Sequence, residues 1–162
     1  MSIYLHLDGK QGEIKGNVTD KNHTDWIQLD SAEFNGVVNR VNMITGQTTH
    51  AVNGKPAFGE FSMTKGLDAS SNLLFQYAHT GEVIHTATIH YVSADNPVKV
   101  YFEIILENVF ISFFNHSHPG GNHYPGEKFN LSYTQIEQKY LGTDKDATPI
   151  PSGYNISTAS SL

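Results

Sequence analysis

The segment from Val98 to Phe114 constrains the fold more than any other part of the chain, because it is long, apolar and alternating. Alternation with a period of two is typical of a β-strand, and the even positions are almost all apolar: Val98, Val100, Phe102, Ile104, Leu106, Phe110 and Phe114. Strands average about 5–6 residues. A run of this length therefore predicts a bend or bulge, which we place near Glu107 and Asn108.

The two halves of this segment differ at their odd positions. The first half mixes polar and apolar residues there, as expected of a strand face that meets water: Tyr101, Glu103, Ile105 and Glu107. The second half carries Val109, Ile111 and Phe113. Both of its faces are apolar, so we expect them to be covered by the chain itself or by another copy of it. This pattern indicates a protein that assembles.

Most of the remaining chain also has the periodicity of strands. Residues 45–56 contain Thr-Gly, Asn-Gly and Lys-Pro turn signals and predict a protruding loop or hairpin. A bulge around Thr134 and Gln135 would keep the last long strand on one face. We expect strands over residues 2–8, 26–29, 34–44, 57–64, 83–92 and 128–141, with a short possible strand at 154–156.

Residues 68–80 form the one convincing helix pattern. Asp68 can cap the first turn, and Gly81 stands where a left-handed C-terminal residue belongs. An apolar stripe at helical spacing is formed by Leu73, Leu74, Tyr77 and Ala78. Many strands and one flanking helix predict a mainly β fold, a two-sheet β-barrel or sandwich. We expect a single domain over residues 1–162, with a polar tail from about residue 157.

The composition narrows the class of partner. The net charge is −6 and no long basic run occurs, which argues against nucleic acid and anionic membranes. No uncharged apolar run approaches the length of about 18 residues that spans a bilayer. The opening residues MSIYLHLDGKQ lack the pattern of a signal peptide. We expect a protein made in the cytoplasm and without membrane insertion.

The most reactive-looking segment is Asn115 to His123, which holds three histidines. His116, His118 and His123 could bind a transition metal, and the His-x-His pair resembles that of cupin metal sites. The glutamate and the glycine that a cupin also needs are absent at the expected spacing. A surface loop that happens to contain histidines is the better interpretation, so we expect no metal.

The remaining chemistry-bearing residues form no constellation in the sequence. The other histidines lie on differing faces, and we expect structural or surface roles for each: His6, His23, His50, His79, His85 and His90. Glu103 and Glu107 could act as an acid–base pair, but a solvated strand face explains them better. Nucleotide-binding and hydrolase motifs are absent. We expect no enzymatic activity and no cofactor.

A collinear series of segments resembles the haemolysin-coregulated proteins (Hcp), the tube subunits of bacterial type VI secretion systems. No single motif decides this resemblance, which rests on the order of the segments over nearly the whole chain. They are residues 3–9, Gly12-Glu13, 20–23 with Trp26-Ile27, 62–65, 67–73, 101–114, 129–133, 138–140 and 153–156. The sequence departs from the family at residues 14–19, which look like an insertion, at 31–36 and in the histidine-rich loop.

The resemblance implies a two-sheet β-barrel whose subunits form homohexameric rings. Such rings stack into a tube inside a contractile sheath, tipped by a spike protein, and carry effector cargo in the lumen. It also implies release from the cytoplasm to the exterior through that machine, without a signal peptide. We place the seam between subunits at Val109, Ile111 and Phe113. The contact between rings falls in the 45–56 loop, with His50, Asn53 and Lys55 as candidates.

Three alternatives remain open. A phage-type tail tube subunit would share the architecture. A cupin-like metal-binding β-barrel would use His116, His118 and His123. A carbohydrate-binding sandwich would use Trp26 and surface tyrosines, and would be a monomer.

Overall fold

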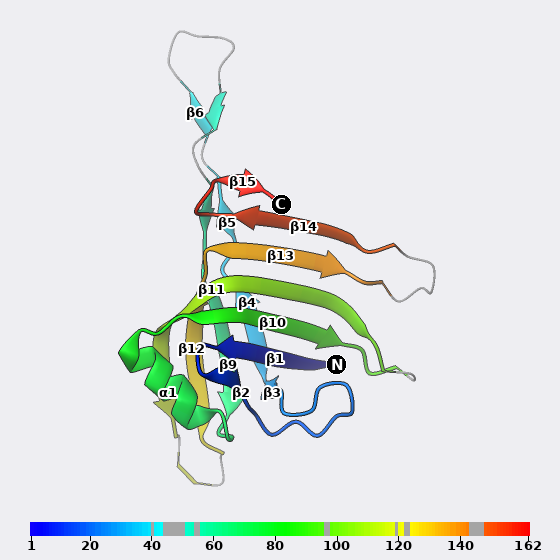
Figure 1. The fold of residues 1–162 in the computed structure, drawn as a ribbon, viewed down its shortest axis with the longest axis vertical. Coiled ribbons are helices and arrows are strands. Elements are labelled where there is room, and N and C mark those ends of the chain that lie inside the picture. The colour runs from blue at the N-terminus through cyan, green and yellow to red at the C-terminus, as the bar shows by residue number, and fades with distance from the viewer. Residues whose placement is uncertain are drawn as a thin grey trace.

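The chain folds into two antiparallel β-sheets with a helix packed beside them, in a computed structural model (Figure 1). The structure describes residues 1–39, 41–43, 51–53, 56–95, 98–118, 120–121, 124–142 and 148–162. Within them the helix is α1 (Ser71–Thr80). The strands are β1 (Ser2–Gly9), β2 (Gly12–Ile14), β3 (Ile27–Leu29), β4 (Ser31–Phe34), β5 (Val37–Val38), β6 (Val41–Met43), β7 (Ala51–Asn53), β8 (Ala57–Phe58), β9 (Phe61–Gly66), β10 (Ile84–Val92), β11 (Val100–Ser117), β12 (Gly126–Ser132), β13 (Gln135–Tyr140), β14 (Ile150–Asn155) and β15 (Ser160–Ser161).

The two sheets share β11. The first sheet has the order β15–β14–β13–β11–β10–β1–β2, and β3 also pairs with β1. The second sheet consists of the far half of β11 followed by β12, β9 and β4. Two short pairs, β5–β8 and β6–β7, form ladders of their own. Backbone hydrogen bonds of Asn35 and Gly59 connect β5–β8 to the pairing of β4 with β9.

The chain passes from one sheet to the other at four places, and one of them is α1, which joins β9 to β10. β11 pairs with β10 and β13 in its first half and with β12 in its second. Only Asp30 separates β3 from β4. β12 and β13, expected as one strand, are two strands in different sheets. Neither sheet closes on itself in the described ranges. The expected mainly β, two-sheet fold is thus confirmed as a sandwich rather than a closed barrel.

Inward-facing side chains of both sheets build the core. They alternate along each strand with outward-facing polar residues, as a pleated sheet with one covered face requires. Burying each such large apolar side chain stabilises the fold by about 1.5–3 kcal/mol. Fully buried members include Leu5, Leu7, Ile27, Phe61, Met63, Ile89, Leu106, Phe129 and Leu131.

Asn108 divides the long strand β11 where the sequence predicts a bend or bulge. It has φ 50°, but the register with β10 is the same on both sides of it, with Val109 opposite Ile84 and Glu107 opposite Thr86. Asparagine tolerates a positive φ better than most residues. The buried parity changes at this residue, from Ile104 and Leu106 before it to Val109 and Ile111 after it.

Helix α1 is shorter than expected and rests on fewer side chains. It begins at Ser71 rather than at residue 68, and the Ser70 side chain at its N-cap accepts no capping hydrogen bond. Leu74 and Tyr77 are buried as predicted, but Leu73 is 37% exposed. The helix ends as predicted at Gly81, which has φ 68° and donates its N–H to the Tyr77 carbonyl over 3.1 Å.

The expected protruding hairpin is formed by β6 and β7, which pair from Val41–Asn53 to Met43–Ala51. Figure 1 shows this pair standing away from the two sheets. No helix in the described residues is long and apolar enough to cross a membrane.

Candidate assembly surface

The structure separates the three residues assigned to the seam between subunits. Val109 is fully buried and Ile111 is 6% exposed, because the buried parity of β11 changes at Asn108, which has a positive φ. Phe113 is 44% exposed. A second irregularity, between Ile111 and Phe113 in the pairing of β11 with β12, reverses the parity again. Only Phe113 of the three therefore offers a large side-chain surface to a neighbour.

An apolar groove lies between α1 and the second half of β11. The cavity has a volume of about 240 Å³ and is lined by Phe75, Ala78, His79, Ile111, Ser112, Phe113 and Phe114. Phe75, 53% exposed, approaches Phe114 with 6.0 Å between ring centroids. Leu73 on α1 and Phe110 on β11 are also more than one third exposed. We call this set the α1–β11 surface.

A second apolar surface lies at the opposite edge of the second sheet, beside β4. Phe34, Val37 and Val38 are 36%, 48% and 55% exposed. Beside them, a groove of about 410 Å³ contains Phe58 stacked on Tyr154, with 5.0 Å between centroids. We call this set, which joins β4 and β5 to β8 and β14, the β4–β14 surface.

The two surfaces flank the two edges of the second sheet. In β11, the pairing with β10 ends at Val109, so residues 110–117 pair only with β12 among the described strands. At the far side, β4 pairs only with β9 in the same part of the chain. An open edge exposes N–H and C=O groups that can pair with another chain. Each edge of this sheet thus combines free backbone groups with exposed apolar side chains.

The predicted contact residues of the protruding hairpin fall largely outside the described part of the chain. Asn53 ends β7 opposite Val41. His50 and Lys55 lie outside the described residues, so their assignment stays a prediction.

The histidine-rich loop does not bring its histidines together in the described residues. The His116 Nδ1 lies 3.3 Å from Glu127 Oε1, and its ring packs against Phe114. The His118 Nδ1 accepts a hydrogen bond from the Gly120 N–H over 3.3 Å. His123 lies outside the described residues, and those described contain no group of three potential metal ligands.

A buried charge cluster, missed in the sequence, joins β9, β12 and the start of α1. The Lys65 Nζ donates to Asp68 Oδ1 and lies within salt-bridge distance of Glu127 Oε2, each at 2.7 Å. Lys65 and Glu127 are 1% and 2% exposed. The Ser71 hydroxyl also donates to Glu127 Oε2, over 3.1 Å. This cluster fixes the start of the helix to two strands of the second sheet.

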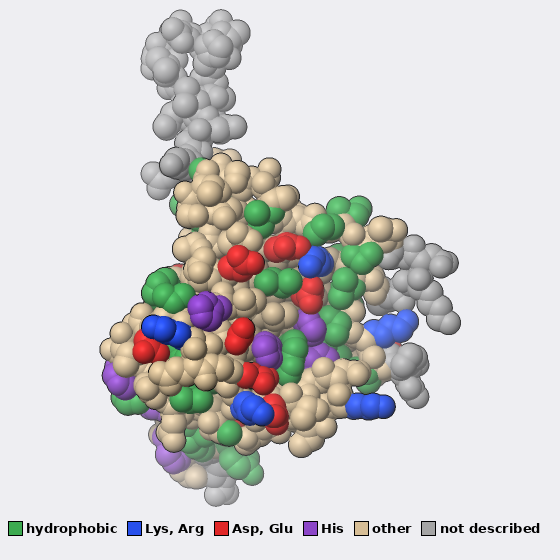
Figure 2. Space-filling view, in the orientation of Figure 1, with side chains coloured by type: hydrophobic (Ala, Val, Ile, Leu, Met, Phe, Trp, Pro, Cys, Tyr) green, Lys and Arg blue, Asp and Glu red, His purple; other side chains and the backbone are tan. Residues whose placement is uncertain are grey.

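Three histidines expected to be scattered converge on the outer face of the first sheet, so that expectation is wrong for them. His6, His23 and His90 surround Trp26, with ring centroids 5.1, 4.8 and 4.6 Å from it. Figure 2 shows histidine and acidic side chains gathered on this face. Glu103, expected to be merely solvated, accepts a hydrogen bond from His90 over 2.8 Å. The sequence contained one sign of this cluster: His6 on β1 and His90 on β10 are at even positions that lie on the same face of the sheet.

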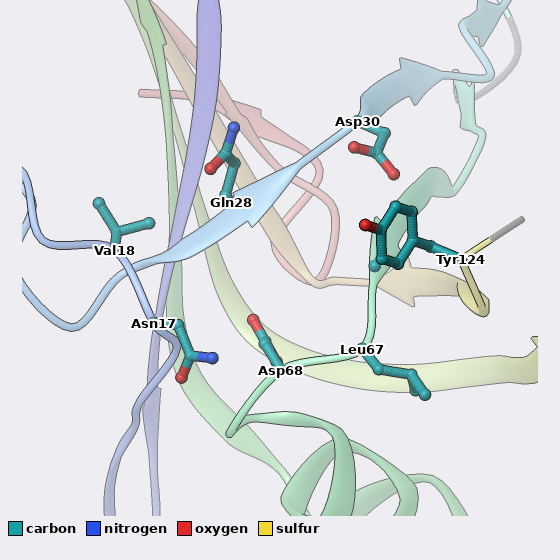
Figure 3. Close-up of a pocket in the computed structure, with 8 residues that line it drawn as sticks. Asn17, Val18, Gln28, Asp30, Leu67, Asp68 and Tyr124 are labelled. Carbon is teal, nitrogen blue, oxygen red and sulfur yellow. The ribbon is translucent and has the colours of Figure 1, made fainter. Parts of the chain in front are cut away.

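A polar cavity of about 690 Å³ lies near the N-terminal end of α1 (Figure 3). It is lined by Asn17, Val18, Gln28, Asp30, Gly66, Leu67, Asp68 and Tyr124. The Asp68 carboxylate is already occupied by Lys65 and by the Ser70 N–H. The described residues here contain no nucleophile held by a base.

Comparison with known protein families shows to which family this chain belongs. A family model described as "Type VI secretion system effector, Hcp" matches residues 4–140. The chain belongs to the Hcp family. The resemblance seen in the sequence is thereby confirmed. No curated protein matches the chain.

Solved structures show that this member has the Hcp fold. A structure titled "Structure of a type six secretion system protein" is 23% identical, covers 99% of each chain and has a TM-score of 0.87. Hcp1 from Salmonella typhimurium is 21% identical, covers 99% of this chain and 98% of its own, and has a TM-score of 0.78.

A phage-derived neighbour is more distant. The anti-feeding prophage cap, which terminates a tube, is 10% identical over 86% of this chain and 88% of its own, with a TM-score of 0.60. The phage-type alternative therefore fits less well than a tube subunit of a type VI secretion system. Hcp proteins are structural and secreted, and they form ring-like assemblies.

Proposed function

We propose that residues 1–162 act as one tube-subunit domain that closes into hexameric rings, and that these rings stack into the tube of a type VI secretion system. The observation that carries this proposal is the pair of different apolar surfaces at the two open edges of the second sheet. A closed ring needs head-to-tail contacts, in which one surface of a subunit meets a different surface of the next. A two-fold dimer would need only one self-complementary surface.

The proposed seam joins the α1–β11 surface of one subunit to the β4–β14 surface of its neighbour. Phe75 and Phe113 on the first and Val37 and Val38 on the second are about half exposed in the single chain. Burying them against one another removes apolar area from water, at about 25 cal/mol per Å². Ile111 supports Phe113 from the core side, and the free backbone groups of β4 and of residues 110–117 add edge pairing.

The remaining parts of the proposal concern the tube as a machine component. The β6–β7 hairpin, with His50, Asn53 and Lys55, reaches an adjacent ring. The sheath, the spike and effector cargo are the partners, and the subunit leaves the cytoplasm through the machine without a signal peptide. The subunit has no catalytic role. The β6–β7 hairpin stands away from the two sheets in Figure 1, which supports its assignment as the contact between rings.

Cross-linking between introduced cysteines tests the head-to-tail seam, because the natural chain contains no cysteine. The double variant Phe113→Cys with Val38→Cys should give a ladder of covalent oligomers with a short bismaleimide, ending at the closed ring. Each single variant should stay uncross-linked, since neither surface meets its own copy. The products are resolved by denaturing electrophoresis.

A matched control places the second cysteine away from the seam. Phe113→Cys with His85→Cys, which is exposed on β10 of the first sheet, should give no ladder. Efficient dimers from Phe113→Cys alone would show a two-fold contact and contradict the proposed seam.

A further inference from the structure

Two imidazoles, the buried His23 and the half-buried His90, lie in a continuous hydrogen-bonded chain between two carboxylates. The His23 Nδ1 lies 3.0 Å from Asp20 Oδ1, and the His23 Nε2 lies 3.0 Å from the His90 Nδ1. The His90 Nε2 lies 2.8 Å from Glu103 Oε2. Asp20 and His23 belong to the segment 15–26 that joins β2 to β3, whereas His90 and Glu103 belong to the first sheet. The chain therefore ties this segment to the sheet.

Counting the protons fixes the charge of this pair. A carboxylate only accepts hydrogen bonds, so the outer nitrogen of each imidazole must carry a proton and donate it. The central contact needs one further proton, on one of the two facing nitrogens. Three N–H groups on two rings correspond to one neutral imidazole and one imidazolium. With one proton fewer, two lone pairs face each other; with one more, two N–H groups do.

We propose that His23 and His90 share a single additional proton between Asp20 and Glu103, and that a second proton, taken up from solvent in acid, breaks their contact and releases the segment 15–26 from the sheet. The pair is then a proton-operated latch. It lies within one protomer, so it is independent of the proposed ring.

Ionisable and aromatic groups surround the pair. On β1, His6 lies beside Trp26 and pairs with Glu13 of β2 over 3.0 Å, and the Tyr4 ring stacks on His23. On β13, Lys139 contacts Glu103 over 3.6 Å and Glu137 over 3.1 Å. The carboxylates Asp20 and Glu103 stabilise one positive charge, while His6 and Lys139 oppose a second.

The pKa of the half-buried His90 agrees with this resistance to a second proton. Burial lowers the pKa of His90, a hydrogen bond to Glu103 opposes the shift, and charge on His23 or His6 lowers the pKa further. The hydrogen bond from His23 lowers the pKa of Asp20, so this carboxylate stays ionised. The unfolded chain takes up protons at His90 more readily than the folded chain. For this second proton, the difference between the folded and the unfolded chain stabilises the fold above about pH 6.5, and this stabilisation is lost as the pH falls below that value.

Release of the segment would change the polar cavity of Figure 3. Asn17 and Val18 of this segment form one wall of it, and the Asn17 Oδ1 accepts a hydrogen bond from the Ala69 N–H over 3.3 Å. Within the segment, the Gly16 N–H donates to the Asp25 carbonyl and the Val18 N–H donates to the Trp26 carbonyl. The rings of His23 and Trp26 hold the segment to the sheet around His90. The latch thus controls whether the wall stays in place.

Imidazole nitrogen shifts measured by NMR on the full chain test the proton count directly. Near about pH 7.5, His23 and His90 should together carry three nitrogen-bound protons, and a second uptake should follow in acid. Two neutral rings at the starting pH, or two rings that titrate independently, would overturn the shared proton. This readout needs no variant.

Hydrogen exchange and fluorescence test the release. Between about pH 7.5 and about pH 5, the protection factors of the Gly16, Val18 and Asp25 amides should fall by about tenfold or more. The fluorescence of Trp26, the single tryptophan, should change over the same range. His90→Gln should remove both transitions, and His85→Gln, on an exposed position of the same strand, should keep them. Constant protection in the natural chain, or a transition that survives His90→Gln, would overturn the latch.

Discussion

Replacing Phe113 with glutamate is expected to convert the rings into folded monomers. The side chain is 44% exposed in the single chain, so a carboxylate there is hydrated in the monomer and costs the fold little. In the proposed seam the same carboxylate is buried against apolar groups without a partner, which is costly. Loss of a central aromatic contact alone weakens an interface by about 2 kcal/mol or more. Size-exclusion chromatography with light scattering gives the mass, and circular dichroism checks the fold.

Two other substitutions separate the seam from the core. Phe113→Leu keeps an apolar side chain and should retain rings. Ile111→Glu places a charge on a side chain that is 6% exposed and should unfold the protomer itself. Rings that persist in Phe113→Glu, at the concentration at which the natural chain forms them, would remove this residue from the seam.

Replacing Lys65 with methionine should give the largest loss of stability of any single charge removal. Its ammonium group lies between Asp68 and Glu127, at 2.7 Å from each carboxylate, and its side chain is fully buried. Without it, the fully buried Glu127 and the mostly buried Asp68 lose the lysine between them and keep hydrogen bonds from Ser71 and Ser70. Removing one partner of a buried ion pair costs about 3–5 kcal/mol. Urea unfolding, followed by circular dichroism in the same assembly state, measures the difference.

Lys128 supplies the matched control for this prediction. It is the neighbour of Glu127 on β12 but points outward and is exposed. Lys128→Met should change the free energy of unfolding by less than about 0.5 kcal/mol. Adding Glu127→Leu to Lys65→Met should recover part of the lost free energy of unfolding. The double variant replaces the ion pair with two apolar side chains and removes one of the two buried carboxylates. Equal midpoints for Lys65→Met and Lys128→Met would contradict the role of the cluster.

The rules of strand parity explain what the sequence could predict. The length of the alternating run predicted a bend or bulge near Glu107 and Asn108, and Asn108 has a positive φ at the point where the buried parity changes. The same rule could have found the charge cluster, since Lys65 has the parity of Phe61 and Met63 on β9, which are buried. Its partner needed the pairing of strands as well, because Lys65 and Glu127 stand opposite each other across β9 and β12.

Other features depend on placements that no local pattern contains. His23 and His90 are 67 residues apart, and they meet only because the segment 15–26 folds over the face on which Tyr4 and His90 are paired. Leu73 fits the helical stripe in the sequence, but α1 rests on the sheet through Leu74 and Tyr77, so Leu73 stays exposed. The exposure of the three residues assigned to the seam also depends on such placements: the parity change at Asn108 puts Val109 inside, and the irregularity between Ile111 and Phe113 leaves Phe113 outside.

The native mass of the purified natural chain tests the central claim most directly. Light scattering on the eluting peak, with negative-stain images of the same fraction, should show closed six-membered rings. The contradicting result is a monomer, or a dimer with two-fold symmetry, at protein concentrations well above those at which a ring-forming relative is found as rings. It would rule out the assignment of this chain as a ring-forming tube subunit.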